Sequence, residues 1–112
     1  MKFATFIKMA AVAGVFAAGS VQAAPDLAKV NQILAANACL ACHAIDKKVV
    51  GPSYQEIGAK YKGQQDQAAT LIKHVRDGSS GVWGPIPMPP NKTIPDADLK
   101  LVVDWLVAGA PQ

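Results

Sequence analysis

The sequence of 112 residues is poor in the residues on which most metal and redox sites depend. It contains only two cysteines and two histidines. A structural zinc site needs about four Cys or His ligands. The chain has only these four, and His74 lies far downstream of the other three, which does not favour a zinc cluster. A redox dithiol usually lies in a βαβ unit, and the chain shows no alternating strand pattern that would build one.

Clusters of positive charge are also missing. The net charge of +3 includes Lys2 and Lys8, which lie in an N-terminal segment that we expect to be removed. The remainder is nearly neutral and has no Lys/Arg cluster of the kind that marks nucleic-acid binding. The sequence therefore predicts no nucleic-acid partner.

The apolar run from Met9 to Ala18 is too short for a membrane span of about 20 residues. Lysines precede it and Val21-Gln22-Ala23 follows it, which is the order of a secretory signal peptide. We therefore predict a cleaved signal peptide over residues 1–23 and a single domain over residues 24–112. The prediction implies a periplasmic protein without stable membrane insertion; an uncleaved anchor is the alternative.

The two cysteines lie close together, in the segment Cys39-Leu40-Ala41-Cys42-His43. This is the C-x-x-C-H attachment signature of c-type haem, in which two thiols bind the vinyl groups and the histidine binds iron. In a helical turn, positions i, i+3 and i+4 share a face, so these three side chains can reach one haem. The haem motif, residues 39–43, therefore predicts one covalent haem c. A disulfide or dithiol without haem is the alternative.

A second unusual segment is the proline loop, residues 78–91, in which four prolines surround Met88. Proline fixes φ and removes a hydrogen-bond donor, which predicts a stiff, extended loop. Met88 would be the only methionine after signal cleavage, and a thioether opposite histidine raises the reduction potential of haem iron. We predict His43 and Met88 as axial ligands. A core role for Met88 and iron ligation by His74 are the alternatives.

The apolar periodicity elsewhere predicts helices rather than strands. The first begins at Asp26, a good N-cap, and leads directly into the haem motif. A capping box at Ser53-Tyr54-Gln55-Glu56 predicts a second helix to about Tyr61. A third is expected over about 66–76 and a fourth over about 96–108. The expected fold class is all-α.

These segments resemble the bacterial class I cytochromes of the c-551/c-552 (cytochrome c8) group. The resemblance rests on residues 38–46, 50–54 and 77–91 and on the helix that carries Trp105. It implies a small single-domain class I cytochrome c fold, with about four helices around one covalently attached haem. The chain departs from this group in a slightly longer link after Asn91 and in four extra residues, 109–112.

The resemblance also implies roles around the two ligands. The Pro52 carbonyl would accept a hydrogen bond from Nδ1–H of His43, which would fix the orientation of the ring. Asn91 would donate its amide to the sulfur of Met88.

Two further residues are expected to contact the haem propionates. Trp83 would donate its indole N–H to one of them, although a core aromatic is the alternative. His74 would contact a buried propionate, and the two groups would titrate as a coupled pair. The reduction potential should then fall as the pH rises through the range of that pair.

The expected function is that of a periplasmic monohaem electron carrier in a respiratory or denitrification chain. It would not be an enzyme, because both axial positions would be occupied. Its expected partners are a cytochrome complex as donor and a nitrite reductase, oxidase or peroxidase as acceptor, and it is expected to be a monomer. Val50 and Ile86 would border the exposed haem edge, and Lys47 and Lys48 would steer an acidic partner or form a solvated face. A haem enzyme or gas sensor with a vacant iron position is the alternative.

Overall fold

The computed structural model describes Gly14 and residues 24–112, so the predicted signal peptide lies almost wholly outside the described residues. The helices are α1 (Leu27–Ala36), α2 (Tyr54–Tyr61), α3 (Ala68–Asp77) and α4 (Asp96–Val107). Two short 3-10 turns, η1 (Cys39–Ala41) and η2 (Gln65–Gln67), lie between them. In residues 24–112 the only β pairing is two isolated bridges, which confirms the all-α prediction.

The helices begin where the sequence predicts. The Asp26 side chain accepts a hydrogen bond from the amide of Ala28 at 3.1 Å, which caps α1. Ser53 and Glu56 form the complete capping box of α2, with bonds of 3.1 and 3.4 Å. Acidic residues occupy the first turn of α4, where they complement the positive end of the helix dipole.

Two helix boundaries differ from the prediction. The first helix does not run into the haem motif, because Ala38 adopts a left-handed conformation (φ 59°) and directs the chain into the separate turn η1. The third helix begins at Ala68, since η2 occupies the residues before it. Hydrophobic periodicity does not report such local changes of backbone geometry.

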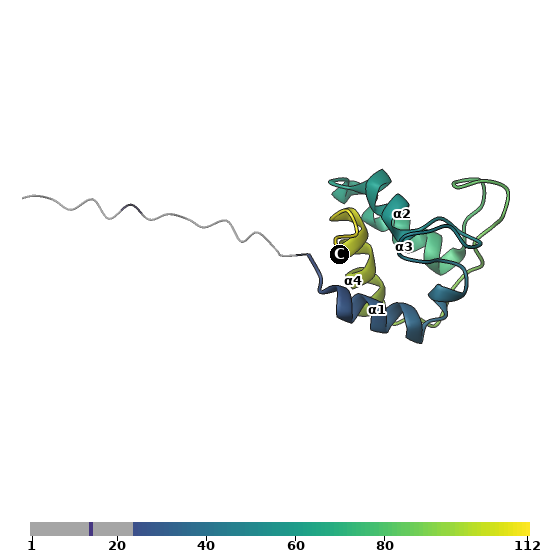
Figure 1. Cartoon of the computed structure of the whole chain (residues 1–112), viewed down its shortest axis with the longest axis horizontal. Helices are drawn as coiled ribbons and strands as arrows, with labels where there is room; N and C mark the ends of the chain where they lie inside the picture. Colours follow the sequence, from purple (N-terminus) through teal and green to yellow (C-terminus); the bar gives the residue numbers. More distant parts are fainter. Residues whose placement is uncertain (1–13, 15–23) are drawn as a thin grey trace, which may run out of the picture.

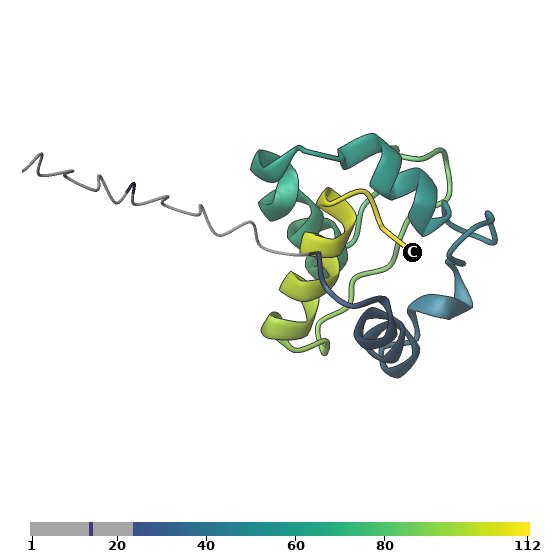
Figure 2. The same cartoon turned by 60° about the vertical axis from the view of Figure 1, so that its left-hand side comes forward.

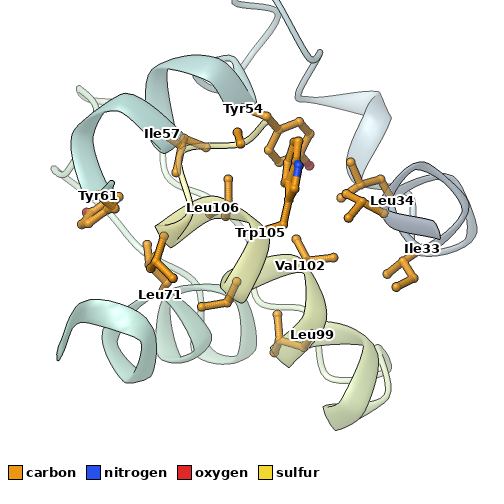
Figure 3. Packing of buried hydrophobic residues seen from close by; sticks show 14 of the residues in the cluster. Ile33, Leu34, Tyr54, Ile57, Tyr61, Leu71, Leu99, Val102, Trp105 and Leu106 are labelled. Atoms are coloured by element: carbon orange, nitrogen blue, oxygen red, sulfur yellow. The ribbon is translucent and has the colours of Figure 1, made fainter. Parts of the chain in front are cut away.

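The last helix forms the centre of the molecule and packs against the other three (Figures 1 and 2). None of the helices within residues 24–112 is both long and apolar enough to cross a membrane. Trp105 is fully buried on α4, among aliphatic side chains from every helix (Figure 3). The buried apolar residues are Val30, Ile33, Leu34, Tyr54, Ile57, Tyr61, Leu71, Ile94, Leu99, Val102, Val103, Trp105, Leu106, Val107 and Ala110.

An ion pair between Asp77 and Lys92 joins the end of α3 to the segment that follows the proline loop. The Asp77 carboxylate accepts hydrogen bonds from Lys92 at 2.8 Å and from Lys73 at 3.0 Å. These bonds lower the pKa of Asp77 to about 2, and the bond from Lys92 has the largest effect. The carboxylate is exposed, so solvent and salt screen the pair.

We expect Asp77→Asn to reduce the free energy of unfolding near pH 6 but to have less effect near pH 3. The folded pKa lies below the unfolded value, so this contribution is complete above pH 4 and is lost as the pH falls towards 2. Urea unfolding of both proteins at several pH values measures it. A difference that stays constant with pH would exclude this origin.

Candidate functional site

A cavity of about 700 Å³ lies between the haem motif and the proline loop. This volume is in the range of roughly 300–1,000 Å³ that is typical of cofactor sites. The structure brings every predicted cofactor residue to the wall of this one cavity. They are Cys39, Cys42, His43, Pro52, His74, Trp83, Met88 and Asn91. The remaining wall is largely apolar, and it is formed by side chains from all four helices together with residues of the proline loop and of the connecting segments.

The two cysteines lie at the ends of a single tight turn. The amides of Cys42 and His43 both donate to the carbonyl of Cys39, at 3.2 and 3.0 Å. Both thiols are half-buried and are not joined in a disulfide. Burial raises the pKa of the Cys39 thiol. Reactive dithiols have lowered thiol pKa values, so this environment does not favour the dithiol alternative.

The imidazole of His43 is buried and has a defined hydrogen bond. Its Nδ1 lies 2.7 Å from the carbonyl oxygen of Pro52. A carbonyl can only accept, so Nδ1 is the donor, and in the neutral imidazole Nε2 then has a free lone pair. This tautomer is the one that binds a metal through Nε2, with the Pro52 carbonyl orienting the ring.

The backbone at Gly51 lies directly against this ring. A Cβ atom built at Gly51 would be 2.6 Å from Cε1 and 2.9 Å from Nδ1 of His43. The amide of Gly51 also donates to the carbonyl of Cys42 at 2.8 Å, which holds the segment in place. Only the folded chain shows how close Gly51 lies to the imidazole.

We expect Gly51→Ala to destabilise the haem-loaded protein by about 1–3 kcal/mol, the usual range for an overpacked site. The methyl group would displace the ring of His43 or the backbone beside it. Guanidinium unfolding measures the loss of stability. Gly51 is not among the glycines with a positive φ, so a loss here reports the contact with His43 and not backbone strain. A change of less than about 0.5 kcal/mol, the usual range for a surface substitution, would contradict the crowding.

The proline loop is closed at its base by Met88 itself. The amide of Met88 donates to Ser79 at 2.8 Å, and the amide of Ser79 donates back to Met88 at 3.1 Å. Gly78 permits this closure, since a Cβ at its left-handed position would lie 2.7 Å from the Met88 carbonyl. Met88 is half-buried on the cavity wall. The loop is therefore anchored at its methionine, which proline content alone does not reveal.

The other predicted residues differ in how they contact their neighbours. Nδ2 of Asn91 lies 3.4 Å from the carbonyl of Asn37, and its Oδ1 accepts from Thr93 and Ile94. Its predicted bond to the sulfur of Met88 stays a prediction. His74 is half-buried on α3 and lines the cavity.

Trp83 lies in the proline loop, lines the cavity and is 40 % exposed. The ammonium group of Lys60 on α2 lies 4.8 Å from the centre of its ring. This cation–π contact joins the loop to α2. Nothing in the order of residues relates Lys60 to Trp83, so only the folded chain shows this contact.

Tyr54 packs against the imidazole on the other side of the site. Its ring centre lies 5.1 Å from that of His43 and 5.8 Å from that of Trp105. Burial raises the pKa of Tyr54 far above its ordinary value, so its hydroxyl stays protonated. Tyr54 and Tyr61 are both buried, as expected for packing groups.

One edge of the cavity reaches the surface through apolar side chains. Ile86 and Val50 are 62 % and 44 % exposed, and they line a small surface pocket together with Trp83 and Lys48. Their place beside an exposed haem edge stays a prediction. Exposed large apolar groups gathered in one place often mark an interaction surface.

The donor set fits a haem. Two thiols stand at the spacing of the attachment signature, a buried imidazole keeps its metal-binding nitrogen free, and a thioether lies on the same wall. The largely apolar wall suits a porphyrin ring.

Comparison with known proteins shows the family of the chain. The family model for cytochrome c matches residues 18–109. The chain is 46 % identical to cytochrome c-552 of Nitrosomonas europaea, over 87 % of this chain and 88 % of that protein. It is 40 % identical to cytochrome c-551 of Pseudomonas aeruginosa, over 91 % and 98 %.

A solved structure is similar as well. The crystal structure of Nitrosomonas europaea cytochrome c552 superposes with a TM-score of 0.65 at 47 % identity, covering 69 % of this chain and 95 % of that one. The fold is thus the class I cytochrome c fold that the resemblance implies. The chain belongs to the cytochrome c family and carries one covalently attached haem c.

Proposed function

We propose that this chain is a periplasmic monohaem electron carrier in which His43 and Met88 are the axial ligands of the haem iron. Its relatives indicate a monohaem electron carrier. The observation that carries the ligand assignment is that both side chains line one cavity with the two cysteines, and that the His43–Pro52 hydrogen bond leaves Nε2 free.

The chain's own residues would keep both ligands in place. When bound, the haem supplies an iron that accepts and releases one electron. His43 is held by the carbonyl of Pro52, and Met88 is held by its paired backbone bonds with Ser79. Two retained ligands leave no iron position for a substrate, so we propose that the chain is not an enzyme.

The exposed apolar edge supports transient contact with other redox proteins. Val50 and Ile86 stand at the mouth of the cavity, and encounters of this class use small interfaces. Exposed Lys47 and Lys48 nearby favour an acidic partner. We propose a cytochrome complex as donor and a nitrite reductase, oxidase or peroxidase as acceptor, with the carrier itself monomeric.

An absorption spectrum of the chain expressed with its N-terminal segment and purified from the periplasm tests this proposal. We expect sharp α and β bands on reduction and a thioether-to-iron charge-transfer band on oxidation. The mass should correspond to one haem on a chain that begins at Ala24. A high-spin spectrum that shifts with carbon monoxide would instead show an open iron position and support an enzyme or sensor.

We further propose that His74, on the cavity wall, contacts a haem propionate. Replacing it with glutamine is expected to weaken the fall of the reduction potential with rising pH. A proton lost beside the haem favours oxidised iron, which has one more positive charge. Potentiometry between pH 5 and 8 measures this. Lys73→Gln, on the exposed face of the same helix, is the control. An unchanged pH dependence in His74→Gln would reject the assignment.

A further inference from the structure

The C-terminal residues fold back onto the body of the molecule. After α4 the amide of Gly109 donates to Leu106 at 2.9 Å, and that of Ala110 donates to Trp105 at 3.0 Å. The chain then runs past α2, as Figure 2 shows near the label C. We call residues 109–112 the C-terminal strap.

The strap packs closely against α2 at Gly58. Ala110 is 2 % exposed and has a left-handed backbone, with φ of 50°. A Cβ at Gly58 on α2 would lie 2.6 Å from the Cβ of Ala110 and 2.6 Å from the carbonyl carbon of Gly109. A left-handed alanine is unfavourable and persists where its surroundings enforce it. The strap is therefore a fixed part of the fold.

The strap also holds the central tryptophan. Nε1 of Trp105 donates to the carbonyl of Pro111 at 2.9 Å. Trp105 is fully buried, so this carbonyl satisfies a donor that water does not reach. The orientation of the indole thus depends on a residue six positions later in the chain.

Trp105 is the first member of a stack of rings that ends at His43. Its ring is tilted by 59° against Tyr54, and Tyr54 is tilted by 36° against His43. Figure 3 shows the indole and the phenol ring lying against each other between α4 and α2. Tyr54 thereby contacts both the tryptophan that the strap orients and the imidazole.

We propose that the C-terminal strap is a positioning element for His43, acting through Trp105 and Tyr54. The Pro111 carbonyl fixes the orientation of the Trp105 indole, and the indole packs against the phenol ring of Tyr54. The phenol ring then limits the motion of the imidazole around its hydrogen bond to Pro52. The inference rests on the proposed role of His43 as a ligand.

Hydrogen exchange of the His43 Nδ1 proton in the haem-loaded protein, followed by NMR, tests the proposal. A chain that ends at Ala108 lacks the strap, and we expect this proton to exchange roughly tenfold faster, the factor for one hydrogen bond of ordinary net strength. A chain that ends at Pro111 keeps an acceptor for Trp105 and should exchange like the full chain. If the shorter chain does not fold, a chain that ends at Ala110 replaces it.

A second measurement separates positioning from general stability. In Tyr54→Leu the stack is interrupted, so removing the strap should add little further exchange at His43, whereas Tyr54→Phe should keep the full response. Unchanged exchange at His43 after strap removal, or an equal response with and without the Tyr54 ring, would overturn the proposal. Exchange of the His43 proton does not depend on Met88. The charge-transfer band tests the proposed iron ligation by itself, so a failure of that ligation and a failure of the strap proposal are distinguishable.

Discussion

Met88→Ala is expected to abolish the thioether-to-iron charge-transfer band and to lower the reduction potential by a substantial part of the roughly 0.8 V that axial ligands span. A neutral thioether favours reduced iron, and alanine has no atom that replaces it. The variant should also bind carbon monoxide, because one axial position would be open. Spectroscopy and potentiometry of the purified, haem-loaded protein measure all three effects.

The structure indicates that this substitution leaves the loop in place. Met88 pairs with Ser79 through its backbone amide and carbonyl, and neither bond involves the side chain. Unfolding of the haem-loaded variant should therefore remain cooperative. Ile86→Ala is the matched control, since Ile86 lies in the same loop with a side chain that is 62 % exposed. A charge-transfer band that survives in Met88→Ala would assign the sixth ligand to another residue.

The second large effect is expected at Trp105. Trp105→Ala should reduce the free energy of unfolding by about 3–5 kcal/mol, the usual range for removing a large aromatic side chain from a core. The residue is fully buried on the helix that packs against the other three. Its loss also removes the support of Tyr54 and the donor to Pro111. Guanidinium unfolding of the haem-loaded protein measures the change.

Two further variants serve as comparisons for Trp105→Ala. Trp105→Phe keeps an apolar ring beside Tyr54 but removes the N–H, so a loss of only about 1 kcal/mol is expected. Val49→Ala removes part of a side chain that is half exposed and should change stability by less than about 0.5 kcal/mol. Equal losses in Trp105→Ala and Val49→Ala would contradict the central place of Trp105 in the core.

Much of the site could be predicted from the sequence because its chemistry is local. The haem motif fits two thiols for covalent attachment and one iron ligand into five residues, and its spacing is set by the geometry of one turn. The helices were recognisable from apolar periodicity and from Asp26 and Ser53, whose caps involve neighbours within three residues. Met88 was recognisable because prolines surround the only methionine of the expected mature chain.

Other features depend on residues that are far apart in the chain. Gly51 contacts His43 only because the chain turns back through the bond between Gly51 and Cys42. Lys60 on α2 contacts Trp83 in the proline loop, and the residues beside each of them in the sequence do not predict this contact. Asn91 illustrates the limit most clearly, since its amide lies beside the carbonyl of Asn37, a residue 54 positions earlier.

The sequence by itself determined the haem attachment, the helical class and the residues available as ligands, because each depends on residue types at short and regular spacings. Only the tertiary structure decided how these residues are held. The closure of the proline loop by Met88 and Ser79, the contact of Gly51 with the imidazole and the ring stack from the C-terminal strap to His43 all arise from packing between distant segments. Such contacts follow from the shape of the whole core, and no local pattern of residues encodes that shape.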